Sequence, residues 1–152
     1  MRLSSELQSQ TINKYVISQV LDKTKRTKWR NKFNEHDLVI ESWANGVWCK
    51  QVGLISYADL ATYLRQESQM KAEKLSVMKT ENEFVVTSYQ GGDKAYLVKF
   101  KNASGWRCNC LRYRCWRRRL HEEMPKLLQH FNGKVFCHHI LAVYNRYSKS
   151  SK

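Results

Sequence analysis

Residues 108–110 read Cys-Asn-Cys, and residues 137–139 read Cys-His-His. Side chains two residues apart in an extended strand point to the same side, so both cysteines of the first segment can bind one metal ion. On a regular helix the same spacing separates side chains by about 200°, so the second segment must straddle the start of a helix. Structural zinc sites take four tetrahedral Cys or His ligands. We therefore predict one Zn²⁺ site formed by Cys108, Cys110, Cys137 and His139.

Further candidate ligands lie between the two segments, and these are Cys115, His121 and His130. Any of them can replace one predicted ligand. Cys115 adjoins Trp116 in a helical pattern, and we expect it to pack there because free cysteines behave as small hydrophobes. We expect Cys49 to pack in the core for the same reason. We expect His138 to face solvent or to contact a phosphate group.

Two segments before the cysteines have the composition of strands. Residues 84–89 and 95–100 are rich in β-branched and aromatic side chains, and the turn residues 90–93 separate them, which predicts a β-hairpin. A second turn at 102–105 leads into residues 106–110, which begin a third predicted strand. The two-cysteine segment therefore lies at the end of a small antiparallel sheet.

The residues after the third strand predict helices. Residues 111–124 have a helical pattern, and Pro125 suits the first position of a further short helix. The pair Asn132-Gly133 indicates a turn. Residues 138–147 place apolar side chains along one face of a final helix.

The N-terminal half predicts a mixture of helix and hairpin. Residues 9–22 place apolar side chains at spacings of three and four, as in an amphipathic helix. Residues 39–49 carry the turn signal Asn45-Gly46 and predict a hairpin. Ser56 and Asp59 resemble a capping pair ahead of a helix that fades into polar residues.

Together these patterns predict an α+β fold. Residues 1–80 form an α-rich, helical or mixed N-terminal region. Residues 81–152 form a zinc-binding domain, in which a small antiparallel sheet precedes a ββα-like finger with a helical, basic insertion at 111–136.

The order C-x-C, gap, C-x-H resembles the SWIM-type zinc finger. The resemblance covers roughly residues 84–147 and includes the two aromatic-rich strands, the turn at Gly133 and the segment 137–143, which looks like the family's exit helix. The gap at 111–136 is long for the family. SWIM fingers occur in transposase-like proteins, remodeller-type helicases and recombination mediators, where they are thought to bind DNA or partner proteins. The resemblance therefore implies bound zinc and an accessory role in binding DNA or a partner.

The chain is strongly basic. Its 152 residues include 27 Lys and Arg against 13 Asp and Glu, a formal net charge of +14, and residues 81–152 hold 14 of the basic and 5 of the acidic side chains. Such an excess draws a protein to polyanions, either nucleic acid or an acidic membrane. No stretch approaches the ~18 consecutive apolar residues of a spanning helix, and no secretory signal begins the chain. We expect a cytoplasmic protein, nucleoid-associated or nuclear, with no membrane partner.

Arginines and aromatic side chains are interleaved in residues 111–120. At about 100° per residue, three of these arginines share one helical face and two flank it. Arginine binds phosphate bidentately, and aromatic neighbours can stack on bases or pack inward. A second basic run lies at 23–32. We predict that nucleic acid, DNA rather than RNA, contacts Arg112, Arg114, Arg117, Arg118 and Arg119.

The predicted function is that of a non-catalytic, zinc-binding accessory protein that binds nucleic acid. A catalytic zinc keeps an open coordination position and usually needs a carboxylate base, whereas Glu122 and Glu123 are the only acids between the two ligand pairs. The chain also has no P-loop and no dinucleotide fingerprint. The alternative is an adaptor whose finger docks a larger DNA-processing protein. The salt dependence of DNA binding separates these two functions.

Overall fold

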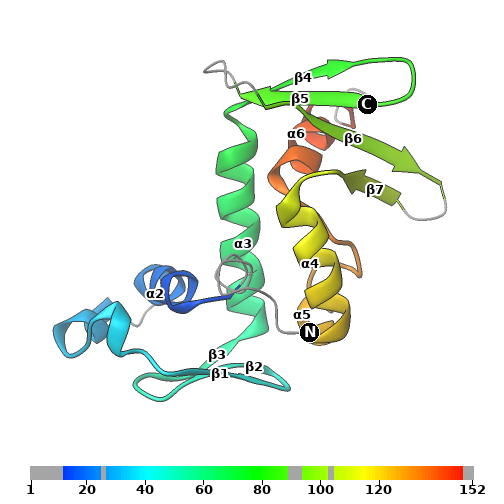
Figure 1. Ribbon diagram of the computed structural model, residues 1–152. Coiled ribbons are helices and arrows are strands. Elements are labelled where there is room, and N and C mark those ends of the chain that lie inside the picture. Colours follow the sequence, from blue (N-terminus) through cyan, green and yellow to red (C-terminus); the bar gives the residue numbers. More distant parts are fainter. Residues whose placement is uncertain (1–11, 25–26, 89–93, 103–104, 149–152) are drawn as a thin grey trace.

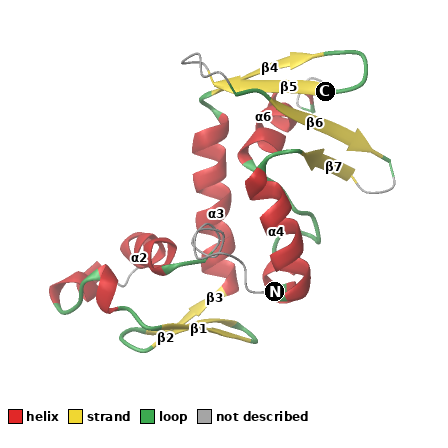
Figure 2. Ribbon diagram, viewed as in Figure 1, coloured by secondary structure: helices red, strands yellow, loops and turns green. Residues whose placement is uncertain are grey.

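The computed structural model describes residues 12–24, 27–88, 94–102 and 105–148. Within them the chain forms five α-helices, two short 3₁₀ helices and two antiparallel sheets of three and four strands (Figure 1, Figure 2). The predicted α+β class is confirmed. The first residues of the helix predicted at 9–22, and the turn predicted at 90–93, lie outside the described residues.

The described N-terminal segment consists of short helices. The helix α2 (Lys14–Lys23) confirms the predicted amphipathic helix, and the 3₁₀ helices η1 (Thr27–Asn31) and η2 (Glu35–Asp37) follow it. Asn13 caps α2, because its side-chain oxygen accepts a hydrogen bond from the Val16 amide at 2.9 Å.

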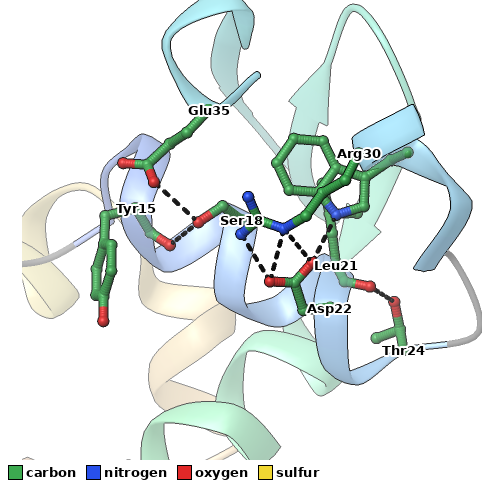
Figure 3. A network of polar contacts seen from close by, with 8 residues as sticks. Tyr15, Ser18, Leu21, Asp22, Thr24, Arg30 and Glu35 are labelled. Carbon is green, nitrogen blue, oxygen red and sulfur yellow. Dashed lines mark hydrogen bonds and ion pairs between the residues drawn. The ribbon is translucent and has the colours of Figure 1, made fainter. Parts of the chain in front are cut away.

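Polar contacts join these helices to one another (Figure 3). The Asp22 carboxylate accepts a hydrogen bond from the Arg30 guanidinium at 2.7 Å and another from the Trp29 indole at 3.0 Å. The Arg30 contact lowers the pKa of Asp22. Part of the basic run at 23–32 is therefore engaged within the fold.

The first sheet is built from β1 (Ile40–Trp43), β2 (Gly46–Cys49) and β3 (Gly53–Ser56), antiparallel and in that order. The strands β1 and β2 form the hairpin predicted within residues 39–49. Gly46 has a steric role, because a β-carbon at this position would collide with the carbonyl oxygen of Ile55 on β3.

The helix α3 (Tyr57–Ala72) runs from the first sheet to the second (Figure 1). Ser56 caps it as predicted, accepting a hydrogen bond from the Asp59 amide at 3.2 Å. The helix continues through polar residues in which the sequence pattern fades. One reason why the helix continues is that Gln69 accepts a hydrogen bond from the side chain of Asn145 at 3.0 Å, which ties this polar half of α3 to a helix far along the sequence.

The second sheet has the strand order β4-β5-β6-β7, and all neighbouring strands are antiparallel. The predicted hairpin and third strand are confirmed as β5, β6 and β7. An additional strand, β4, occupies one edge and is not indicated by the sequence pattern. The bounds are β4 (Leu75–Lys79), β5 (Phe84–Ser88), β6 (Tyr96–Lys101) and β7 (Gly105–Cys108).

Three helices follow the second sheet, and they are α4 (Leu111–Glu122), α5 (Pro125–Gln129) and α6 (His138–Tyr147). Proline occupies the first position of α5, as predicted. The predicted turn at Asn132-Gly133 is confirmed, because both residues have positive φ angles, 54° and 72°. This turn leads the chain toward the start of α6.

Buried apolar side chains form two clusters. The first lies among α2, the three-stranded sheet, α3 and the insertion helices, and includes Leu21, Val47, Leu60, Trp116 and Leu127. The second lies between the four-stranded sheet and α6, and includes Val86, Val98, Ile140 and Val143. The insertion at 111–136 therefore packs largely against the N-terminal half, and a domain boundary after residue 80 stays a prediction. None of the described helices is long and apolar enough to cross a membrane.

Candidate metal centre

The structure brings the four predicted zinc ligands together in one buried group. Cys108 ends β7, and Cys110 caps the N-terminus of α4. Cys137 occupies the N-cap position of α6 without a side-chain capping hydrogen bond, and His139 lies in the first turn of α6. Their ligand atoms all lie within 4.8 Å of one another. Two segments separated by 26 residues of sequence thus meet where β7, α4 and α6 converge.

The distances within the group fit a tetrahedral ion. Nδ1 of His139 lies 3.6 Å from Sγ of Cys108 and 3.8 Å from Sγ of Cys137. Around tetrahedral zinc, with bonds of about 2.3 Å to sulfur and about 2.0 Å to nitrogen, an S···N edge measures about 3.5 Å and an S···S edge about 3.8 Å. The side chains therefore stand near the separations that zinc requires.

Backbone contacts fix the segment that carries the first two cysteines. Asn109 pairs with Leu97 on β6 through two hydrogen bonds: its side-chain Oδ1 accepts from the Leu97 backbone amide at 2.9 Å, and its backbone amide donates to the Leu97 carbonyl at 3.1 Å. The Cys110 amide donates to Sγ of Cys108 at 3.4 Å, and the Tyr113 amide donates to Sγ of Cys110 at 3.3 Å. These contacts hold both sulfur atoms toward one point.

The three thiols lie close enough to share protons. Hydrogen bonds from Cys108 and Cys137 hold the pKa of Cys110 far below its ordinary value. The hydrogen bond to Cys110 raises the pKa of Cys108 to about 12, and hydrogen bonds to Cys108 and Cys110 raise that of Cys137 as well. Negative charge therefore gathers on Cys110, at the N-terminus of α4, where the helix dipole stabilises a thiolate.

Two aromatic rings contact His139, the histidine of the Cys₃His group. The ring of Tyr96 stacks on the ring of His139, with 4.2 Å between centroids and 27° between planes. The ring of His138 lies 4.1 Å from that of His139 between centroids and is half-buried, so His138 does not simply face solvent, and its contact with a phosphate group stays a prediction. Burial lowers the pKa of His138 to about 4 and keeps it neutral. The stacking role of Tyr96 was not predicted, although its inward position on β6 follows from strand alternation.

The alternative ligands lie apart from this group. His121 and His130 are exposed, and Cys115 is half-buried on α4 rather than packed in the core. Cys49 is fully buried in the first cluster, which confirms its predicted packing role. The described residues contain no other group of three or more potential ligands.

The five predicted arginine contacts differ in their surroundings. Arg114, Arg117 and Arg118 are exposed on α4, and Arg118 forms an ion pair with Glu122 at 3.2 Å. The other two are engaged elsewhere. Arg112 pairs with Glu67 on α3 at 3.4 Å and lies over the Trp116 ring, and Arg119 pairs with Glu123 at 2.9 Å. The side chains of Arg112 and Arg119 are only 18% and 16% exposed. Nucleic-acid contact by all five stays a prediction, since the structure assigns no ligand to them.

Comparison of the chain with models of known protein families, with characterised proteins and with solved structures found no match. The resemblance to the SWIM finger therefore rests on the ligand spacing and the order of the elements. The structure independently supports the coarser conclusion, which is a buried Cys₃His group able to hold a metal ion.

Proposed function

We propose that this protein is a zinc-stabilised, non-catalytic nucleic-acid-binding protein. The observation that carries the proposal is the buried Cys₃His group. Three sulfur donors and one imidazole, with no carboxylate among them, favour Zn²⁺ over Mg²⁺ or Ca²⁺. All four side chains are buried, which favours a closed structural site, because a catalytic zinc needs an open position for water or substrate.

Zinc at this point would tie three elements together. Its ligands come from the end of β7 and from the N-termini of α4 and α6. The second buried cluster packs around the same junction and includes Tyr113 and Ile140. The metal would therefore fix how α4 leaves the sheet, and with it the direction of the basic helix.

The nucleic-acid part of the proposal rests on charge and its placement. Arg114, Arg117 and Arg118 project into solvent from α4, whose first turn begins at a ligand. Guanidinium groups bind phosphate bidentately, and the whole chain carries a net charge of +14. Arg112 and Arg119 are paired with carboxylates and are largely buried, so we assign them a smaller contribution than Arg118, whose pair with Glu122 is more than half exposed.

A second candidate function, docking to a larger DNA-processing protein, is favoured by one observation on the first sheet. The rings of Trp43 and Trp48 stack with 4.8 Å between centroids and 11° between planes, and Trp43 is 44% exposed. Aromatic side chains of this kind are enriched at protein interfaces. In this case the basic charge would steer the protein toward an acidic partner.

The test combines metal content with salt-titrated binding. Elemental analysis of protein purified without added metal should give about one zinc per chain. Binding to random-sequence DNA should weaken steeply as salt increases, because phosphate contacts release counterions. Absence of zinc would refute the metal assignment. Weak DNA binding with little salt dependence would refute the nucleic-acid assignment and favour the adaptor.

A further inference from the structure

Four aromatic side chains form a row along one face of the second sheet. The ring centroids of Tyr147 and Phe84 lie 5.0 Å apart, those of Phe84 and Trp106 lie 5.8 Å apart, and those of Trp106 and Phe100 lie 5.0 Å apart. We call this set the aromatic row. It begins at the end of α6 and finishes on the hairpin of β6 and β7, so it joins the metal-bearing part of the fold to that hairpin.

The row becomes exposed toward the hairpin. Phe100 and Trp106 are directly paired across β6 and β7, so both rings lie on the same face of the sheet. Trp106 is half-buried, whereas Phe100 is 54% exposed. This hairpin projects away from α6, as Figure 1 shows. The planes of the two rings meet at 61°, so the Trp106 ring contacts the Phe100 ring edge-on and the phenyl ring itself is accessible to solvent.

Positive charge lies on the same strand as the exposed end of the row, on the opposite face of the sheet. Lys99 and Lys101 flank Phe100 in the sequence and are exposed, and strand alternation directs their side chains away from the face that carries Phe100. Lys99 forms an ion pair with Glu83 at 3.0 Å, so Lys101 is the more accessible cation of the two. No acidic side chain occurs between residues 94 and 121. The charge of this region therefore suits a polyanion.

The row is also connected to the basic helix. The Tyr113 hydroxyl on α4 donates a hydrogen bond to the Trp106 carbonyl at 3.2 Å. Arg117 lies one helical turn beyond Tyr113, on the same side of α4. Arg117 is therefore the exposed arginine of α4 that faces the hairpin.

We infer that the protein binds single-stranded nucleic acid, with bases stacked on Phe100 and Trp106 and phosphates bound by Arg117. The inference rests on the proposed function and specifies its substrate class. Aromatic side chains combined with a basic surface are the chemistry that binds single strands without sequence preference. In a duplex the base faces are stacked on one another, so Phe100 has no base to contact there.

The experiment measures binding of the zinc-loaded full chain to a fluorescein-labelled oligothymidine and to a random-sequence duplex of equal length. The variant Phe100→Ala should weaken binding to the single strand by about 5- to 150-fold, the range for loss of one stacked base. Its duplex affinity should change less than twofold. The variant Phe100→Leu should behave like Phe100→Ala, because it keeps apolar volume without a ring, and Phe100→Trp should restore binding.

A matched control is Met78→Ala, which removes another exposed apolar side chain of the same sheet, 61% exposed on β4. It should bind both probes as the parent does. If Phe100→Ala binds the single strand as tightly as the parent, the stacking inference is wrong while the proposed function stands. If Phe100→Leu retains parental affinity, the ring acts only through packing, and the inference is also wrong. If the parent binds neither of these probes nor an oligouridine of the same length at low salt, the proposed function itself fails.

Discussion

Replacing Cys137 by Ser should remove the metal and unfold the second cluster, whereas replacing Cys49 by Ser should do neither. Both are fully buried free cysteines, so the two substitutions make the same chemical change in similarly dry surroundings. Their neighbours differ. Sγ of Cys137 lies 3.8 Å from Nδ1 of His139 within the Cys₃His group, while Sγ of Cys49 lies 3.7 Å from Oε1 of Gln51.

The expected costs differ by about an order of magnitude. Burying a hydroxyl costs roughly 1–3 kcal/mol in proteins. The Gln51 oxygen can accept a hydrogen bond from the serine hydroxyl, so Cys49→Ser should lower the free energy of unfolding by about 1 kcal/mol. Structural zinc contributes about 10–16 kcal/mol to the folding of a small module. That matches the whole stability of a typical domain, about 5–15 kcal/mol. Loss of the Cys137 ligand should therefore leave the second sheet and α6 unfolded at about 25 °C.

Elemental analysis and thermal unfolding followed by circular dichroism test both variants. Cys49→Ser should keep the zinc content of the parent and melt about 2–4 °C lower, as expected for about 1 kcal/mol in a chain of this size. Cys137→Ser should contain no stoichiometric zinc and should lose much of its cooperative transition. A Cys137→Ser protein with parental zinc and the melting temperature of Cys49→Ser would refute the ligand assignment. His121 and His130 would then be the next candidate ligands to test by substitution.

Three further predictions follow from other parts of the structure. The exposed arginines of α4 are Arg114, Arg117 and Arg118. Changing all three to Ala should reduce the slope of log affinity for duplex DNA against log salt concentration by up to ~3 units and leave the zinc content unchanged. The control removes the same charge elsewhere, at Lys50, Lys74 and Lys79, and equal effects of the two triple variants would contradict a role for this face. Gly46→Ala should lower the free energy of unfolding by about 1–3 kcal/mol, because the new β-carbon meets the Ile55 carbonyl; an unchanged urea midpoint would show that the hairpin can shift. Cys108 and Cys137 have raised pKa values and are protonated without metal, so zinc binding releases protons. Competition with a chelator should therefore show that the protein binds zinc more tightly at higher pH. Equal zinc affinities at about pH 6.5 and about pH 8 would exclude thiol ligands.

Local patterns predicted most of the helices and strands, and they failed where distant partners decide the structure. The second half of α3 is polar, yet it stays helical because Glu67 pairs with Arg112 and Gln69 binds Asn145. Arg112 and Asn145 both lie far beyond the spacing of three or four residues at which side chains of one helix meet. The strand β4 was missed for a related reason. Of its side chains only Val77 is fully buried, so its five residues carry little alternation of their own and depend on pairing with β5.

The Cys₃His group was predictable because its spacing reflects local geometry. A strand places residues two apart on one side, and a helix start does the same for a cap residue and the second residue of the first turn. The stacking of Tyr96 on His139 could not be predicted from local sequence patterns, since it depends on how β6 packs against α6. The ion pair of Arg112 with Glu67 could not be predicted either, because Glu67 lies 45 residues earlier, on α3.

The helix α4 links the metal centre, the N-terminal half and the basic surface. It begins at Cys110 of the Cys₃His group, and its Tyr113 side chain packs in the second cluster, while Trp116 and Leu120 pack in the first. These buried positions follow the spacing of three and four that keeps one side of a helix inward. The exposed arginines necessarily occupy the other side. Zinc at Cys110 would fix the start of this helix, and the first cluster holds its continuation. Nucleic-acid affinity should therefore depend on the metal, because the direction of the arginine face depends on it, although the ligand group contains no arginine.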